Sequence, residues 1–396
     1  MLTNSEVVSL AKKNYMNNYA QAPVAIKSGR GMILTDEDGK EYLDFVSGIA
    51  VNALGYADED IRKALLEVLD EGVLHTSNLY YNRRAAEAAA KLNELAGSRQ
   101  VFFCNSGAEA NEAALKMARK RGSAKGKSRI ISFRDSFHGR TYGAVTLTGQ
   151  DKYHKGFAPM LPDVQYAVYN DLDSVRALMD ETVAAVFAEP VQGEGGIIPA
   201  DKSFLKGLRE LCSQYDALLI FDEVQCGIGR TGRPFCFQHY GIAPDILTAA
   251  KALGGGLPMG AVLAFDRAAD IFSPGDHAAT FGGNVAAAAL ALVVLSKLDS
   301  LCPHVETEGA FLHERLEALV LRHPDRAAGA RGLGFMQGLV LKVSVPAVVA
   351  ACREKGLLVC SAGHDVLRLV PPLIASRSDI DKAVSIIDEV LSEFKD

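Results

Sequence analysis

Residues 217–226 read ALLIFDEVQC, a short apolar run that ends in two carboxylates. The run Ala217–Phe221 has the length of a strand, and a strand that is apolar at every position is typical of a parallel sheet covered on both faces. Asp222 and Glu223 follow at its carboxyl end, where open α/β sheets bind their ligands. This stretch predicts an α/β fold and indicates the edge of the sheet at which a site should lie.

Similar apolar runs occur before and after this strand and alternate with helical patterns. The other predicted strands are Gln100–Cys104, Arg129–Phe133, Ala184–Ala188, Ile246–Ala249 and Ala261–Phe265. The helical patterns between the strands cover Ala108–Lys120, Leu172–Met179 and Lys202–Tyr215. This alternation predicts a mainly parallel sheet with helices on both faces.

The pattern changes after a helix predicted at Ala286–Leu298. Pro303 separates it from the next elements, which are a helix at Val305–Arg322, strands near Gly334–Val343 and Leu367–Leu369, and a last helix at Ser376–Phe394. We therefore expect a large domain over residues 51–299 and a small domain over residues 300–396. Residues 1–50 contain a hairpin signal at Asp36–Gly39 and are expected to pack with the small domain.

Composition excludes several classes of protein. The 396 residues are 48% hydrophobic with a net charge of −6, which excludes disorder and disfavours a nucleic-acid binder. Met1–Asn18 lacks the apolar stretch of a signal peptide, and the longest apolar run, Val285–Leu295, is too short to span a bilayer. The seven cysteines show no metal-binding spacing and indicate reduced thiols. We expect a cytoplasmic protein without metal, nucleic-acid or membrane partners.

Two glycine-rich segments resemble nucleotide-binding loops but lack their context. Residues 122–128, GSAKGKS, have one residue too few between the glycines for a P-loop, and they precede a strand. Gly227–Gly232 matches G-x-G-x-x-G, but Pro234 follows where a helix should begin. A shaped active-site loop is the favoured interpretation of the second segment, with a nucleotide or nicotinamide site as the alternative.

Three other segments together suit pyridoxal phosphate. Ser106, Gly107 and Ala108 join a strand to a helix, and a helix N-terminus reached through glycine offers free amides to a phosphate. Asp222 can pair with a pyridinium nitrogen, and Lys251, which ends the apolar segment Ile246–Ala250, can form an imine with an aldehyde. Each segment alone has an ordinary structural explanation, so the prediction depends on their combination.

Further candidates follow the ends of other strands. Phe137 could cover one face of a planar cofactor with Val224 on the other, and Arg140 could bind a carboxylate. Glu189 and Glu194 lie in a glycine-rich loop, which suggests a site more than a plain turn. Arg368 is a second carboxylate-binding candidate, and His138 is interpreted as structural.

The order of these residues resembles that of the class III pyridoxal-phosphate aminotransferases. The most specific blocks are FFCNSGAEANEAALK, SFHGRTYGAVTLTGQ, AEPVQGEGG, LIFDEVQCGIGRTG and AAKALGGGLPMGA, and the likeness runs from Asp44 to the Arg368 segment. The resemblance implies the type I fold of these enzymes, with a mainly parallel seven-stranded sheet in the large domain and a smaller α+β C-terminal domain. It also implies a homodimer with the active site at the subunit interface.

The resemblance implies a role for each matching residue. The implied cofactor contacts are Ser106, Gly107 and Ala108 to the phosphate, Phe137 and Val224 to the ring faces, Asp222 to the ring nitrogen, Gln225 to the phenolic oxygen, Lys251 as the Schiff-base lysine, and Thr280 to the phosphate in the neighbouring subunit. Lys251 and Asp222 are the implied catalytic residues.

Substrate contacts are implied in the same way. Arg140 resembles the arginine that holds the carboxylate of an acetylated amino acid. Glu194 and Arg368 resemble a switch in which the glutamate covers the arginine for the amino donor and releases it for a dicarboxylate. Ala279 stands at a substrate-site position that is often serine, and Tyr56 replaces a common histidine; the first departure bears on fine substrate preference.

Within the class, the likeness is greatest to enzymes that act on N2-acetyl-L-ornithine in arginine biosynthesis. The expected reaction transfers the terminal amino group to 2-oxoglutarate and yields N-acetyl-L-glutamate 5-semialdehyde and L-glutamate. Ornithine, succinylornithine and 4-aminobutyrate are the alternative donors, because enzymes for these substrates share the same cofactor residues.

Overall fold

A central sheet organises the computed structural model, which describes residues 2–394. In this part of the chain the sheet has seven strands in the order β4-β12-β11-β10-β7-β5-β6. Their bounds are β4 (Gln100–Cys104), β5 (Arg129–Phe133), β6 (Val164–Ala167), β7 (Val183–Ala188), β10 (Leu218–Asp222), β11 (Ile246–Ala249) and β12 (Gly260–Ala264). Strand β12 runs antiparallel to β11 and β4, and the other four pairings are parallel, so the predicted mainly parallel sheet is confirmed.

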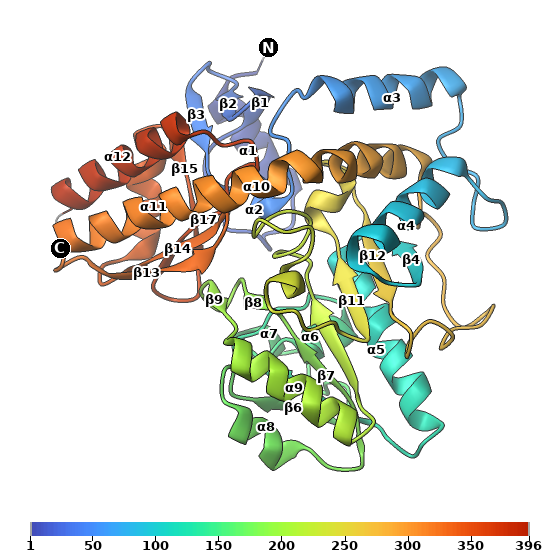
Figure 1. Cartoon of the computed structure of the whole chain (residues 1–396). Coiled ribbons are helices and arrows are strands. Elements are labelled where there is room, and N and C mark those ends of the chain that lie inside the picture. Colours follow the sequence, from blue (N-terminus) through green and yellow to red (C-terminus); the bar gives the residue numbers. More distant parts are fainter. Residues whose placement is uncertain (1, 395–396) are drawn as a thin grey trace.

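Helices cover both faces of this sheet (Figure 1). The helices are α5 (Gly107–Ser123) on one face and α8 (Leu172–Leu178) and α9 (Lys202–Gln214) on the other. Strand β10 is buried at every position. Leu218 and Ile220 join the core under α5, whereas Leu219 and Phe221 join the core under α9, as the two-residue period of a strand requires. Burial on both faces explains the uniformly apolar run in the sequence.

The C-terminal part forms a second sheet in the order β13-β14-β17-β16. Its elements are β13 (Ala327–Leu333), β14 (Met336–Leu341), α11 (Val345–Glu354), β16 (Cys360–Ala362), β17 (Val366–Leu369) and α12 (Arg377–Glu393). The N-terminal elements are α1 (Asn4–Asn14), β1 (Ile26–Arg30), β2 (Ile33–Asp36) and β3 (Glu41–Asp44), and β2 and β3 form the expected hairpin. Strand β3 also pairs with β15 (Leu357–Leu358).

A single helix, α10 (Val285–Arg322), replaces the two helices expected on either side of Pro303. That expectation is wrong, because both halves of α10 are buried and their packing outweighs the hydrogen bond that proline cannot donate. Helix α10 contacts α3 (Glu59–Glu71) and α4 (Arg83–Ala96) near its start and β13 and α12 near its end. The domain division at residue 300 stays a prediction, since α10 continues through it.

Helix α10 contains a window that is long and apolar enough to cross a membrane. More than half of that window is buried inside the fold, as in the core helix of a folded domain. The seven cysteines are all free thiols, and six of them are buried.

Several short elements complete the chain. They are α2 (Ser47–Ala50), α6 (Tyr142–Leu147), α7 (Asp151–His154), β8 (Val191–Gln192), β9 (Ile198–Pro199), η1 (Cys236–His239) and η2 (Lys251–Gly254). Strands β8 and β9 form a small hairpin whose turn carries Glu194. This hairpin lies between the two larger sheets in Figure 1.

Candidate active site

A cavity of about 520 Å³ opens at the carboxyl ends of the central strands. It is lined by residues that follow β4, β5, β7, β10 and β11. Among them are most of the residues singled out in the sequence, namely Ser106, Gly107, Ala108, Phe137, Arg140, Glu194, Asp222, Val224, Gln225 and Lys251. The strand-end rule therefore located the cavity correctly.

The N-terminus of α5 forms one wall of this cavity. Ser106 is the N-cap, and it accepts the Glu109 amide on Oγ and the Ala110 amide on its carbonyl. The amides of Gly107 and Ala108 have no recorded partner within residues 2–394. Two free amides at a helix N-terminus suit a phosphate. Glycine is needed at 107, because a Cβ there would lie 2.6 Å from Val224.

Asp222 is held by three donors at the end of β10. Its Oδ2 lies 2.7 Å from both His138 Nδ1 and Asn111 Nδ2, and its Oδ1 accepts the Val224 amide at 2.9 Å. Asn111 is fixed in turn by Thr248, whose hydroxyl donates to the other end of the amide at 2.7 Å. These contacts fix the orientation of the carboxylate while leaving it without an arginine or lysine partner within 4 Å in the described chain.

The ring of His138 must carry its proton on Nδ1 to donate to the Asp222 carboxylate. Its Nε2 is buried with no partner among the described residues, and the edge of the ring meets Phe187 at 4.8 Å between centroids. His138 thus serves the site by orienting Asp222. The sequence pattern indicates only a structural role for His138 and does not single out Asn111, because the two residues reach Asp222 from separate elements.

Glu189 is a second buried carboxylate beside the cavity. It accepts the backbone amides of Phe137 at 3.0 Å and Gly193 at 3.1 Å. Burial and the nearby charge of Asp222 raise the pKa of Glu189 well above its usual value. The glycine-rich loop of Glu189 and Glu194 suggests a site in the sequence, and in the structure Glu189 connects the Phe137 segment to the hairpin that carries Glu194.

Lys251 lies two residues after the last residue of β11, at the first position of η2. Its backbone has φ of +48°, a conformation that costs energy for a residue with a side chain and is common at functional sites. The side chain is partly accessible, through the cavity, and no hydrogen bond to its amine is recorded within residues 2–394. Burial lowers the pKa of this amine, which favours the neutral, nucleophilic form.

Aromatic rings hold Arg140 at the mouth of the cavity. The guanidinium carbon lies 4.1 Å from the centroid of Tyr153 and 5.5 Å from that of Phe137. The two rings meet edge to face at 5.7 Å. Cation–π contact leaves the donors of Arg140 available to an incoming carboxylate.

Glu194 and Arg368 form an ion pair with Nη1–Oε1 of 2.6 Å. Arg368 is only 2% exposed, and its Nη1 also lies 3.4 Å from Oε1 of Gln225. Glu194 lines the cavity whereas Arg368 lies behind it, so the carboxylate covers the guanidinium.

Ala279 and Thr280 are not brought into this cavity within one chain. They belong to a loop beside a separate recess lined by His75, Tyr80 and Phe102, and Asn78 donates to the Ala279 carbonyl at 2.6 Å. Thr280 is exposed. Its expected role belonged to the neighbouring subunit and stays a prediction.

The segment Gly227–Gly232 does not form a nucleotide-binding loop. It leads into the short turn η1 instead of a helix N-terminus, and its Arg230 is buried, donating to the carbonyls of Phe335 and Pro371. The loop therefore connects the central sheet to the second sheet, and the nucleotide alternative has no support.

The donor set around the cavity fits a flat, phosphorylated aldehyde. Free amides at Gly107 and Ala108 suit the phosphate, and the Asp222 carboxylate suits a protonated ring nitrogen. An unpaired amine at Lys251 suits the aldehyde. Pyridoxal phosphate carries all three of these groups.

Comparisons with known proteins agree with this chemistry. A family model described as aminotransferase class-III matches residues 14–391. The chain is 48% identical to the acetylornithine aminotransferase of Aquifex aeolicus over 95% of this chain and 99% of that protein. It is 47% identical to the succinylornithine transaminase of Salmonella newport over 91% of this chain and 90% of that protein. The structure resembles the ornithine aminotransferase of Toxoplasma gondii, with a TM-score of 0.94, 30% identity and coverage of 99% and 96%.

Proposed function

The chain belongs to the class III aminotransferases, and we propose that it transfers the terminal amino group of N2-acetyl-L-ornithine to 2-oxoglutarate. The products are N-acetyl-L-glutamate 5-semialdehyde and L-glutamate, in a step of arginine biosynthesis. The cofactor is pyridoxal 5′-phosphate, on which class III aminotransferases depend. Succinylornithine, ornithine and 4-aminobutyrate are the alternative donors, and relatives named for the first two are similar to this chain.

One observation carries the assignment of the site. The free amides of α5, the Asp222 carboxylate and the Lys251 amine line one cavity although they come from segments far apart in the sequence. No single one of these groups is specific. Their convergence provides a contact for the phosphate, the ring nitrogen and the aldehyde of one molecule.

Lys251 is the proposed acid–base residue. When bound, pyridoxal phosphate supplies a ring that accepts electrons from the substrate carbon. Because burial lowers the pKa of Lys251, its Nζ can take the proton from Cδ of the donor, the carbon that carries the transferred nitrogen. In the second half of the reaction, Nζ delivers a proton to Cα of the glutamate that forms.

Asp222 is proposed to hold a proton on the ring nitrogen. His138 and Asn111 each donate to Oδ2 at 2.7 Å, so the carboxylate is kept in one orientation without being neutralised by a cation. A negative charge in that position favours the protonated ring nitrogen. Gln225 and Val224 follow directly in the chain and line the same wall.

Two arginines divide substrate recognition. Arg140 is placed to bind the α-carboxylate of the acetylated donor, while the Glu194–Arg368 pair stays closed over the second arginine. 2-Oxoglutarate has two carboxylates, so its second one displaces Glu194 and binds Arg368 bidentately. One cavity can thereby accept both substrates in turn.

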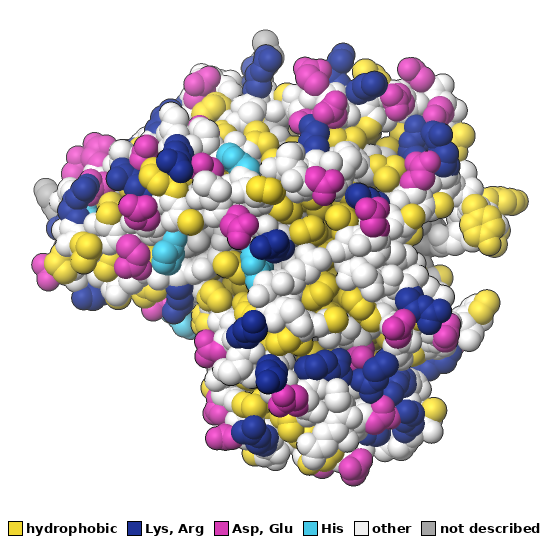
Figure 2. Space-filling model, viewed as in Figure 1, with side chains coloured by type: hydrophobic (Ala, Val, Ile, Leu, Met, Phe, Trp, Pro, Cys, Tyr) yellow, Lys and Arg dark blue, Asp and Glu magenta, His cyan; other side chains and the backbone are white. Residues whose placement is uncertain are grey.

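Exposed apolar residues support a homodimer. The loop between α3 and α4 carries Leu79, Tyr80 and Tyr81, which are 84%, 71% and 104% exposed, and hydrophobic side chains project at its position in Figure 2. This loop contacts the Thr280 loop, where Phe281 is 57% exposed and its ring lies 5.1 Å from that of His75, at a tilted angle. A second subunit would cover this surface and bring Thr280 to the neighbouring phosphate site. The cytoplasmic location stays a prediction.

Replacing Lys251 tests the assignment directly. We expect Lys251→Ala to remove the visible absorbance of protein-linked cofactor and to lower glutamate formation by about 10³-fold or more, because the base is lost. Lys206→Ala, on the exposed face of α9, is the matched control and should change neither property. Unchanged turnover in Lys251→Ala would reject the mechanism.

The donor is identified by a substrate panel. Acetylornithine, succinylornithine, ornithine and 4-aminobutyrate are each supplied with 2-oxoglutarate, and the glutamate formed is measured. We expect the highest kcat/KM with acetylornithine. A higher value with any other donor would transfer the assignment to that substrate.

A further inference from the structure

The hairpin that carries Glu194 is attached to the large sheet by two side chains. Glu189, which follows β7, accepts the Gly193 amide at 3.1 Å. Gln192 donates from Nε2 to the carbonyl of Arg134, which follows β5, at 2.9 Å. These contacts anchor the start of the hairpin to the segments that form the cavity.

The far side of the same hairpin is attached to the second sheet. Arg331, on β13, donates from Nε to the Gly196 carbonyl at 2.7 Å. The Gly363 amide, next to β16, donates to the Glu194 carbonyl at 2.8 Å. Ile197 is fully buried in a cluster with Met336 and Val366 of this sheet. The turn that carries Glu194 is therefore held from both sides.

Its backbone is strained at the point where Arg331 binds. Gly196 has φ of +116° and Ile197 has φ of +57°, a region that a β-branched residue rarely adopts. Such a conformation persists only where surrounding contacts determine it. Backbone hydrogen bonds from the Gly196 and Ile197 amides to the Gly193 carbonyl close the turn, and the Arg331–Gly196 bond and the burial of Ile197 hold it from outside.

Arg331 has no carboxylate partner within 4 Å in the part of the chain that the structure describes. Its guanidinium instead lies against the turn, since a Cβ on Gly196 would come 2.6 Å from Nη2. Charged donors form stronger hydrogen bonds than neutral ones. The contact of the Arg331 guanidinium with the Gly196 turn therefore takes the place of an ion pair with a carboxylate.

We infer that Arg331 is a positioning residue for the Glu194–Arg368 pair and so influences which substrate the cavity accepts. Arg331 lines no part of the cavity and acts through the Gly196 carbonyl, two residues from Glu194. The inference rests on the proposed function, in which the amino donor requires the Glu194–Arg368 pair to be closed and 2-oxoglutarate requires it to be open.

The two half-reactions should respond in opposite directions when Arg331 is lost. A looser turn leaves Arg368 uncovered for more of the time, so the closed Glu194–Arg368 pair that the donor requires is populated less. KM for the donor then rises. KM for 2-oxoglutarate falls or stays the same, because less is needed to displace Glu194. A purely structural role would lower both activities together.

The experiment uses Arg331→Met, which keeps much of the side-chain volume but removes the donor. Each half-reaction is followed separately in the cofactor-loaded enzyme. We expect the ratio of kcat/KM for donor to kcat/KM for 2-oxoglutarate to fall about three- to tenfold, the effect of one charged hydrogen bond acting at a distance. Arg331→Lys, which retains a charged donor, should restore most of the ratio.

Arg326→Met is the matched control, since Arg326 also donates to backbone carbonyls of its own domain but far from the hairpin, at Ser392 and Phe394. It should leave the ratio unchanged. In a Glu194→Gln background, Arg331→Met should have no further effect on the ratio, because the group that it positions is gone.

An unchanged ratio in Arg331→Met, or an equal effect in the Glu194→Gln background, would overturn the inference. Failure of the proposed function looks different, because the wild-type enzyme itself would then form no glutamate from any donor in the panel.

Discussion

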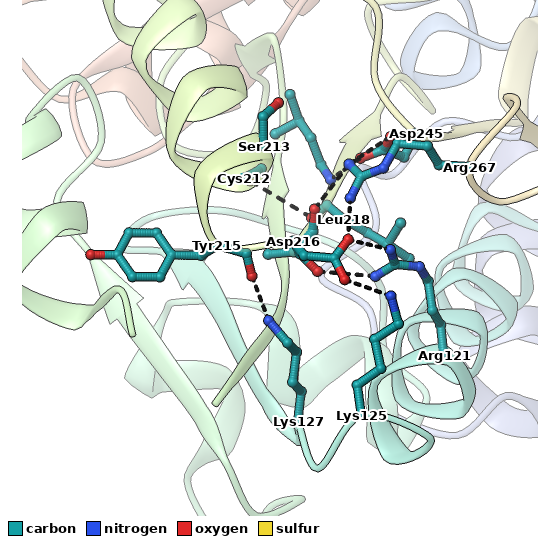
Figure 3. Close-up of polar contacts among 12 residues, drawn as sticks. Arg121, Lys125, Lys127, Cys212, Ser213, Tyr215, Asp216, Leu218, Asp245 and Arg267 are labelled. Atoms are coloured by element: carbon teal, nitrogen blue, oxygen red, sulfur yellow. Dashed lines mark hydrogen bonds and ion pairs between the residues drawn. The ribbon is translucent and has the colours of Figure 1, made fainter. Parts of the chain in front are cut away.

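The two ends of β10 bear acidic residues in opposite environments. At the amino end, Asp216 binds Arg121 and Lys125, each at 2.5 Å, and Arg267 at 2.8 Å, as Figure 3 shows. Asp245, which precedes β11, is paired with Arg209 and Arg267. Asp216 and Asp245 are thus each paired with two arginines.

At the carboxyl end, Asp222, Glu223 and Glu189 are buried without an arginine or lysine within 4 Å among residues 2–394. Their partners are backbone amides, an asparagine and a histidine. Burial raises the pKa of Glu223 to about 8, whereas at the other end hydrogen bonds from Lys125, Arg121 and Arg267 overcome burial and lower the pKa of Asp216.

The comparison indicates that the acidic residues at the amino end of β10 contribute to stability, whereas those at its carboxyl end serve the proposed reaction. A carboxylate paired with arginine contributes to stability, because removing one partner leaves the other charge partly buried without compensation. Carboxylates that are buried without a cation disfavour the folded state. They are retained where a cofactor or a proton has to be bound.

The largest expected effect is at the carboxyl end. Asp222→Asn keeps the shape of the side chain but removes its charge, so the ring nitrogen loses the group that favours its protonation. We expect kcat to fall about 10²- to 10⁴-fold. The free energy of unfolding, measured by urea titration, should not decrease by more than about 1 kcal/mol, because a buried charge is removed. A large loss of stability with little loss of kcat would contradict the functional role assigned to the carboxyl end of β10.

The corresponding change at the amino end should affect stability alone. Asp245 is 4% exposed and accepts the Leu219 amide at 2.7 Å, so Asp245→Asn keeps that hydrogen bond and breaks the pairs with Arg209 and Arg267. Both arginines are partly exposed, and we expect a loss of about 2 kcal/mol in the free energy of unfolding. Turnover should be unchanged at temperatures where the variant is folded. A loss of kcat without a loss of stability would contradict the stabilising role assigned to the amino end of β10.

The smallest effect is a difference in pH dependence. Burial raises the folded pKa of Glu223 from its ordinary value near 4.5 to about 8, so the wild type loses stability as pH rises towards 8. Glu223→Gln cannot titrate, and its free energy of unfolding should improve relative to wild type by about 1 kcal/mol between pH 7 and 9.

Asp216→Asn is the control for this measurement. Against the effect of burial, hydrogen bonds from Lys125, Arg121 and Arg267 lower the folded pKa of Asp216, so its contribution to stability is fully present above its ordinary pKa of 3.8 and is lost only as pH falls below that value. Its difference from wild type should therefore stay constant between pH 7 and 9. A flat profile for both variants would show that Glu223 is ionised in the folded protein.

The sequence was sufficient for the parts of the site that follow strand ends. Lys251, Asp222 and Ser106 each follow a predicted strand, and parallel strands bring their carboxyl ends to one edge. His138 and Asn111 could not be predicted in the same way, because their contact with Asp222 depends on how α5 and the Phe137 segment pack. One feature of the sequence could have indicated Asn111, because it is a polar residue on the alanine-rich, buried face of α5.

Helix boundaries and strand pairing were harder to predict. Strand β6 was missed, because polar residues interrupt its apolar pattern and it lies at the sheet edge. Pro303 suggested a break in α10, but burial on both sides of it maintains one helix. Tyr56, a departure from the family pattern, donates to the buried Asp44 at 2.5 Å, a contact that only the fold reveals.

Helix α10 also limits how the chain can be divided. Its first half packs on α3 and α4, and its second half packs on β13 and α12. A cut near residue 300 would expose Leu298 on the first fragment and Cys302 and Val305 on the second. Neither fragment would keep a complete core. Calorimetry should therefore record one cooperative melting transition, and coexpressed halves split at this point should not reassemble into a soluble enzyme.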